Sequence, residues 1–247
     1  MHKRMIKNIP SSNITKNIDG DKYDNVFIVG DIHGWHTNLM VKLDKIGFNK
    51  DTDLLLCTGD LIDRGPESEE CIELLYEPWF ESVRGNHEDL FIGSQWDKDL
   101  DNIPAHQLAH VTGYRNCHLQ NGGRWVVWDE LKSGQIKELT RLLDVLPYFI
   151  TIERKGVTYG VTHACVPGSD IKASHFSESD LDRVMWDRTL CDIMVSGYEN
   201  HVKGVDKLFY GHTPMGIKTS GNTILIDTGW WIDGDIKKIG LVNIEDY

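Results

Sequence analysis

Short apolar runs recur along the chain, separated by longer stretches in which apolar and polar residues mix. Runs rich in Val, Ile, Leu and Phe predict strands that are buried on both faces of a covered sheet. The predicted strands are Val26–Val29, Leu54–Thr58, Phe80–Val83, Tyr148–Glu153, Val157–Thr162, Lys207–Tyr210 and Thr223–Ile226.

Apolar residues at helical spacing lie between several of these strands. The spacing predicts a helix over Thr37–Ile46 with Gly47 as its C-terminal cap, a second helix that begins at Pro66, and a third over Ile136–Leu146. Strands that alternate with helices indicate an α/β protein, in which helices cover the faces of the sheet.

The domain organisation follows from the length of the chain and from two polar segments. A chain of 247 residues can bury a large core. Residues 1–24 are predicted to be a polar N-terminal lead-in, and residues 25–247 a single domain. Residues 93–123 are polar and show no regular period, so residues 93–145 are predicted to be a variable insertion or lid.

Charge and cysteine content narrow the class of protein. The net charge of −12 disfavours binding to nucleic acid or to an anionic membrane surface. No apolar run approaches the ~20 residues of a membrane span, and the N-terminus lacks the apolar core of a secretory signal. The five cysteines are scattered, with no C-x-x-C pair, which predicts a reducing cytoplasm rather than a disulfide framework.

Five of the predicted strands end in residues that bind metal ions. In open α/β sheets ligands bind at the carboxyl ends of the strands, so these side chains should converge. Oxygen and nitrogen donors without a thiolate suit a pair of divalent ions such as Mn²⁺, Fe²⁺ or Zn²⁺. A pair of ions needs a bridging carboxylate, for which Asp60 is the natural candidate. The residues at the strand ends are Asp31, His33, Asp60, Asn86, His163 and His212.

The motifs around these residues resemble a known family. They are "GDIHG" at 30–34, "GDLIDRGP" at 59–66, "RGNHE" at 84–88, "VTHA" around His163 and "GHTP" at 211–214. Together they resemble the calcineurin-like metallophosphoesterases of the serine/threonine protein phosphatase type, and the flanking text is most similar to small phage protein phosphatases. The resemblance runs from about residue 18 onward and is weakest between about 92 and 145.

The resemblance implies a fold and a set of roles. The expected fold has central β-sheets packed like a sandwich and flanked by helices, with a dinuclear metal site, most often of Mn²⁺, at the strand ends. The first ion would be bound by Asp31, His33 and Asp60, and the second by Asp60, Asn86, His163 and His212. Phosphate would be bound by Arg64, Arg84 and Arg188, and His87 would be the catalytic acid with Asp63 as its carboxylate partner.

The chemistry of phosphate monoesters agrees with these roles. A metal ion lowers the pKa of bound water from 15.7 to about 7, which supplies a bridging hydroxide for direct attack without a phosphoenzyme. The planar fork of arginine suits phosphoryl oxygens. His87 follows a predicted ligand in the sequence, which places it beside the site, and Asp63 would favour its protonated form.

The predicted function is therefore a metal-dependent serine/threonine protein phosphatase, monomeric and cytoplasmic (in the host cytoplasm if the chain is phage-encoded). Its partner is a phosphorylated protein or peptide, and phosphotyrosine stays open as a further substrate. A symmetric dinucleoside tetraphosphatase is the alternative enzyme. A non-catalytic scaffold is disfavoured because His87 and Asp63 are present, and a nucleic-acid phosphodiesterase because the chain is acidic.

Other motifs are weaker. The two histidines of "HQLAH" at 106–110 lack the glutamate of a zinc protease, and "NGGR" at 121–124 lacks the lysine of a P-loop. Asp227 of "DTG" is predicted to anchor a strand end. Trp35 is predicted to line the cleft, and Cys165 to be either a small buried side chain or an oxidation-sensitive thiol. A surface or structural place is predicted for His36, His118, His175 and His201.

Overall fold

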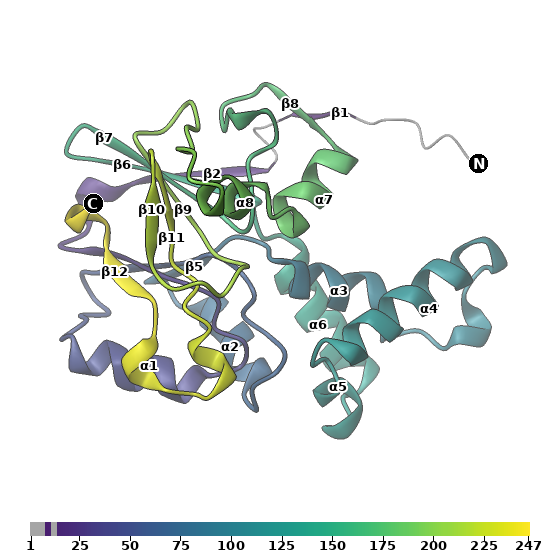
Figure 1. The fold of residues 1–247 in the computed structure, drawn as a ribbon. Coiled ribbons are helices and arrows are strands. Elements are labelled where there is room, and N and C mark those ends of the chain that lie inside the picture. Colours follow the sequence, from purple (N-terminus) through teal and green to yellow (C-terminus); the bar gives the residue numbers. More distant parts are fainter. Residues whose placement is uncertain (1–7, 11–13) are drawn as a thin grey trace.

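The computed structural model describes residues 8–10 and 14–247, and it contains two central β-sheets with helices around them (Figure 1). The first sheet has four strands in the order β12–β3–β4–β5. Since β3, β4 and β5 run parallel, their carboxyl ends lie along one edge. The strands are β3 (Val26–Val29), β4 (Leu54–Cys57), β5 (Phe80–Ser82) and the antiparallel β12 (Leu241–Asn243).

The second sheet has six strands in the order β10–β11–β9–β7–β6–β2. Here β7, β9 and β11 are parallel, so their carboxyl ends also lie together. The strands are β2 (Thr15–Asp19), β6 (Phe149–Arg154), β7 (Val157–Thr162), β9 (Lys207–Tyr210), β10 (Lys218–Ser220) and β11 (Thr223–Leu225). A separate pair joins β1 (Asn8–Pro10) to β8 (His175–Ser177).

Apolar side chains from both sheets form one core between them. Ile28 and Leu56 come from the four-stranded sheet, and Ile150, Val161 and Phe209 from the six-stranded sheet; all five are fully buried in a single cluster. This arrangement confirms the expected sandwich of sheets flanked by helices.

The outer face of each sheet is covered by helices. The four-stranded sheet packs against α1 (His36–Lys45), α2 (Ser68–Glu73), α3 (Asn86–Ser94) and α6 (Ser133–Asp144). The six-stranded sheet packs against α7 (Glu178–Trp186) and α8 (Thr189–Val195). The 3₁₀ turns are Gly20–Lys22, Leu74–Tyr76, Leu100–Asn102, Pro167–Ser169, Trp230–Ile232, Ile236–Lys238 and Ile244–Asp246.

The segment at 93–123 differs from its prediction. It was expected to be irregular, but most of it forms the 16-residue helix α4 (Ala105–Gln120), which packs on α3 and is followed by α5 (Trp125–Trp128). Figure 1 shows α4 and α5 to one side of the sheets. Only Val111 and His118 of α4 are buried, so the helix carries no apolar stripe that its sequence could reveal.

The predicted lead-in also contains regular structure. Thr15–Asp19 forms the edge strand β2, parallel to β6, where residues 1–24 were expected to be a polar lead-in. Mostly polar residues suffice because the strand is largely exposed. Residues 1–7 and 11–13 of that segment lie outside the described residues. Within the described chain, none of the helices combines the length and the apolar character that crossing a membrane requires.

Candidate metal centre

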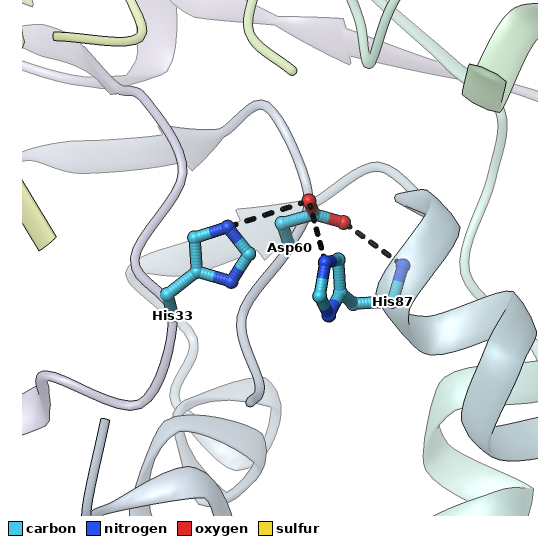
Figure 2. Close-up of side chains that lie close together, drawn as sticks. All are labelled: His33, Asp60 and His87. Atoms are coloured by element: carbon cyan, nitrogen blue, oxygen red, sulfur yellow. Dashed lines mark hydrogen bonds and ion pairs between the residues drawn. The ribbon is translucent and has the colours of Figure 1, made fainter. Parts of the chain in front are cut away.

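The loops at the carboxyl ends of the parallel strands bring the predicted ligands together. Two sets of three side chains each have one ligand atom within 4.8 Å of the others. One set is His33, Asp60 and His87, drawn in Figure 2, and the other is Asp60, His163 and His212. Asp60 belongs to both sets.

Several of these loop residues adopt a backbone conformation that side chains other than glycine rarely adopt. The positive φ angles are 49° at His33, 52° at Asp60, 73° at Asp63, 72° at Arg64 and 69° at His212. Such conformations cost on the order of 1–3 kcal/mol each and persist where the surrounding structure enforces them, typically at functional sites. Their concentration in these loops marks this edge of the sandwich as the site.

The carboxylate of Asp60 lies between the two sets. Its Oδ2 is 3.6 Å from Nε2 of His33, and its Oδ1 is 3.5 Å from Nε2 of His163. The side chain is buried, and each oxygen faces a different imidazole. This is the geometry expected of a carboxylate that bridges two ions.

Backbone carbonyls fix the orientation of two of the imidazoles. Nδ1 of His33 lies 3.0 Å from the carbonyl oxygen of Ile62, and Nδ1 of His163 lies 2.7 Å from that of Thr58. An Nδ1–H that donates to a carbonyl leaves Nε2 with a free lone pair. Burial lowers the pKa of both His33 and His163, which keeps the rings neutral and able to bind a metal.

The donor set fits divalent ions. The Nε2 of His163 faces Oδ1 of Asp60 at 3.5 Å and Oδ1 of Asn86 at 2.9 Å, and Oδ1 of Asn86 also lies 3.0 Å from Nδ1 of His212. Groups that each offer a lone pair repel at this range unless a cation lies between them. Ligands of one ion bound at about 2.0–2.2 Å stand roughly 3 Å apart, which matches these separations.

Asp31 lies beside the cluster but outside both three-residue sets. Its carboxylate accepts hydrogen bonds from the backbone N–H of His212 at 3.1 Å and from Thr58 Oγ1 at 3.2 Å. A Cβ at Gly211 would lie 2.2 Å from Asp31 Oδ1, so this loop requires glycine. Burial, Asp227 and Asp60 raise the pKa of Asp31 well above its ordinary value, as expected where buried carboxyl groups crowd together.

His87 has a different environment from His33 and His163. Its Nδ1 lies 2.7 Å from Oδ2 of Asp63, and both side chains are buried. Burial lowers the pKa of His87, but the charges of Asp60 and Asp63 outweigh that effect and the net pKa is raised. His87 is thus suited to carry a proton beside rings that stay neutral.

Arg64 reaches into the centre of the cluster. Its guanidinium lies 2.5 Å from Nε2 of His33 and 3.0 Å from Nε2 of His87, and its Cζ lies 4.1 Å from the centroid of the Trp231 ring. One lone pair cannot serve both a guanidinium and a metal ion. An ion bound at Nε2 of His33 would therefore require the guanidinium of Arg64 to release that ring.

The other two predicted phosphate-binding arginines are placed differently. The buried guanidinium of Arg84 donates to the carbonyl and to Oδ1 of Asp144, and to the Tyr148 hydroxyl at 3.3 Å. Its Nε has no partner among the described residues. Arg188 is exposed at the N-cap of α8, close enough to help lower the pKa of His212 to about 3, after burial and His163.

Three residues that the sequence did not mark contribute to the site. Glu88 accepts hydrogen bonds from the backbone N–H groups of Asp60, Leu61 and Gly85 at 2.8–2.9 Å, which holds two strand-end loops together. Its place at the third position of α3, where a capping box puts a glutamate, is a signal that the sequence did carry. His118 and Trp125 contact Asp63, and no local motif signals that contact.

The residues of the weaker motifs lie outside the two candidate ligand sets. His106 and His110 are exposed on α4. Asp227 Oδ1 accepts from the N–H of Gly229 at 2.9 Å and so anchors the end of β11, as predicted. Trp35 donates to the carbonyl of Trp231. Cys165 is buried, and burial raises the pKa of its thiol to about 12, which opposes oxidation through a thiolate.

Comparisons with known proteins follow the same motifs. The model of the calcineurin-like phosphoesterase family matches residues 25–216. The serine/threonine-protein phosphatase 2 of Salmonella typhimurium (strain LT2) is 34% identical over 223 residues, which is 89% of this chain and 94% of that protein.

Two further matches have different names. A symmetrical bis(5'-nucleosyl)-tetraphosphatase of Neisseria gonorrhoeae is 43% identical over 68 residues, only 27% of this chain and 24% of that protein. The crystal structure of a proposed diadenosine tetraphosphatase superposes with a TM-score of 0.56 at 17% identity, covering 89% of this chain and 90% of that one, which shows likeness of fold. The predicted similarity to phage phosphatases stays a prediction.

Proposed function

The chain belongs to the calcineurin-like phosphoesterase family, and on that premise we propose that it is a metal-dependent serine/threonine protein phosphatase. One observation carries the choice of substrate class. The similarity to a serine/threonine phosphatase extends over 89% of this chain and 94% of the relative, so it includes the helical segment beside the site. Symmetrical bis(5'-nucleosyl)-tetraphosphatases match less of the chain: 68 residues in one from Neisseria gonorrhoeae, and 160 residues in one from Erwinia tasmaniensis, which is 64% of this chain and 51% of that protein.

The proposal assigns the metal centre as follows. Asp31, His33 and Asp60 would hold one divalent ion, and Asp60, Asn86, His163 and His212 the other, with Mn²⁺ the first choice and Fe²⁺ or Zn²⁺ as alternatives. When bound, the ions supply an activated water and neutralise charge on the phosphoryl group. The positions of the Nε2 atoms of His33 and His163 on either side of Asp60 support this assignment.

The remaining residues would bind phosphate and move the proton. Arg64 already lies in the cluster, whereas Arg84 would have to turn from Asp144 to reach a phosphoryl oxygen. His87 would donate a proton to the serine oxygen as the P–O bond breaks, because an alkoxide is a poor leaving group. Its 2.7 Å contact with Asp63 would keep Nδ1 protonated and leave Nε2 facing the substrate.

Hydrolysis of dinucleoside tetraphosphates is the second candidate. An identity of 43% over 68 residues with one symmetrical bis(5'-nucleosyl)-tetraphosphatase, and of 29% over 160 residues with another, favours it. Phosphotyrosine remains an open third substrate. We also propose a monomer in the cytoplasm; the location is supported by the five cysteines, which are all free.

A direct comparison of substrates tests the proposal. Phosphate release from a phosphoserine peptide and from diadenosine tetraphosphate would be measured with Mn²⁺, with a chelator, and in the variant His87→Asn. His106→Asn, an exposed histidine on α4, is the matched control. We expect metal-dependent turnover of the peptide that falls in His87→Asn and not in the control. Preference for the dinucleotide would replace the proposed substrate, and turnover of neither would reject both assignments.

A further inference from the structure

The buried carboxylate of Asp63 accepts more hydrogen bonds than its pairing with His87 needs. Oδ2 accepts from His87 Nδ1 at 2.7 Å, whereas Oδ1 accepts from His118 Nε2 at 3.0 Å and from Trp125 Nε1 at 2.7 Å. Ser68 Oγ accepts from the backbone N–H of Asp63 at 3.0 Å. Asp63 is therefore held by three helices besides α3: by α4 through His118, by α5 through Trp125 and by α2 through Ser68.

The tautomer of His118 is fixed from its other side. Trp96 Nε1 can only donate, and it lies 3.0 Å from Nδ1 of His118. Nδ1 must accept, so the proton of the neutral ring is on Nε2 and points at Asp63. The negative charge of Asp63 thus remains available to His87.

Close packing around the His118 ring holds it in contact with Asp63. A Cβ at Gly123 would lie 2.3 Å from Nε2 of the His118 ring, so only glycine fits at that position. Phe91 stacks on Trp125 with ring centroids 5.7 Å apart and meets the His118 ring edge-on at 5.8 Å. The "NGGRW" turn at 121–125, which resembles no phosphate loop, therefore packs against His118.

The same turn reaches the residue that follows Asp63. Gly122 has a φ of +107°, and its carbonyl faces the backbone N–H of Arg64 at 3.5 Å. A Cβ at Gly122 would lie 2.6 Å from that nitrogen. The end of α4 and its turn therefore enclose the Asp63–Arg64 loop, whose two residues have positive φ angles of 73° and 72°.

We propose that His118 is a positioning residue for the reaction: its Nε2–H holds Asp63 so that Asp63 orients the imidazole of His87 toward the leaving oxygen. The inference rests on the proposed acid role of His87. In that step hydroxide forms a bond to phosphorus as the bond between phosphorus and the serine oxygen breaks, and the serine oxygen takes the proton from Nε2 of His87. The ring then regains a proton from water, which restores the hydroxide. The helical segment 93–145 thus contributes to catalysis by holding Asp63 in place.

Leaving groups of different basicity test this role. Turnover of p-nitrophenyl phosphate, whose leaving group needs no proton, would be compared with that of phenyl phosphate and a phosphoserine peptide in the Mn²⁺-loaded enzyme. His118→Leu should lower kcat on the last two on the order of 10-fold, a part of what general acid catalysis contributes, and leave p-nitrophenyl phosphate within about 2-fold. His118→Gln, which retains an N–H donor, should recover much of the loss, and His106→Leu on the same helix is the control.

A double-mutant cycle separates positioning from general damage. In the His87→Asn background, His118→Leu should cause no further loss, because the group that it positions is already gone. Equal losses on all three substrates, or additive losses in the cycle, would overturn the inference. If His118→Leu does not fold, as judged by thermal unfolding, Trp125→Phe removes the other N–H on the same oxygen and makes the same test.

Failure of the proposed function would look different. A wild-type enzyme that ignores the phosphoserine peptide but hydrolyses both aryl phosphates would reject the protein phosphatase assignment. The comparison of phenyl with p-nitrophenyl phosphate would still decide the role of His118.

Discussion

The two sides of Asp60 use the same residue type in opposite ways. On the ligand side, His33 and His163 donate Nδ1–H to backbone carbonyls, and burial lowers the pKa of both rings. On the acid side, His87 donates Nδ1–H to the carboxylate of Asp63. There the charges of Asp60 and Asp63 raise the pKa of His87 despite its burial.

The acceptor of the ring N–H therefore decides what each histidine can do. A neutral carbonyl fixes the tautomer without stabilising a positive charge, and the free Nε2 lone pair is left for a metal. A carboxylate fixes the same tautomer and also stabilises the imidazolium. All three rings are fully buried, so exposure to solvent does not account for the difference.

The largest effect is expected from a change that removes the ligand side. Asp60→Asn should lower turnover by about 10³-fold or more, since a metal contributes several kcal/mol and each 1.36 kcal/mol is a factor of ten. The loss should be equal for p-nitrophenyl phosphate and a phosphoserine peptide, and bound Mn²⁺ measured by atomic emission should fall with it. Asp51→Asn, an exposed aspartate, is the control. Full metal content in Asp60→Asn would contradict the bridging role.

A change on the acid side should discriminate between substrates. Asp63→Asn should lower kcat for the phosphoserine peptide by about 10²-fold, the low end for general acid catalysis, and affect p-nitrophenyl phosphate far less. Steady-state kinetics on both substrates measures this difference. Equal losses would mean that the two sides of the site do not have separate roles.

The same variant should shift the pH profile. His87 must be protonated to donate, so kcat for the peptide falls as the pH rises through the pKa of His87. Burial lowers that pKa while Asp60 and Asp63 raise it, so the loss of the Asp63 charge lowers it. The alkaline limb of the kcat profile should therefore move to lower pH in Asp63→Asn. A shift to higher pH, or none, would assign the limb to another group.

The candidate metal ligands could be predicted from the sequence, whereas the residues that hold Asp63 in place on the acid side could not. The strands β3, β7 and β9 have the predicted bounds. The candidate ligands lie within a few residues of strand ends, so the sequence motif also gives their position in the fold. His118 lies 55 residues from Asp63 on a helix without an apolar stripe. Arg84 also lies in a strand-end motif, yet its guanidinium faces Asp144 on α6, because a motif does not fix where a long side chain points.

Arg64 contacts both sides, so a change there should affect both substrates alike. Arg64→Lys keeps the charge but loses the planar fork, and KM should rise roughly 10-fold for the peptide and for p-nitrophenyl phosphate. Initial-rate measurements over a range of substrate concentrations give this ratio. Arg124→Lys, an exposed arginine in the "NGGRW" turn, should leave KM unchanged. An effect of Arg64→Lys on the peptide alone would place Arg64 with the acid side.

The smallest effect on kcat is expected from a change at Trp96, which contacts His118 and reaches His87 only through His118 and Asp63. Trp96→Phe removes the N–H that Nδ1 of His118 accepts, so His118 becomes free to place its proton on either nitrogen. Because one hydrogen bond contributes about 0.5–1.5 kcal/mol, kcat for the phosphoserine peptide should fall roughly 2- to 10-fold, with p-nitrophenyl phosphate unchanged. Trp128→Phe, in the neighbouring helix α5, is the matched control because its side chain is exposed. A loss for Trp96→Phe that vanishes when His118→Leu is already present would show that Trp96 acts through His118. An undiminished loss in that background would mean that Trp96 acts through the packing of α4 alone.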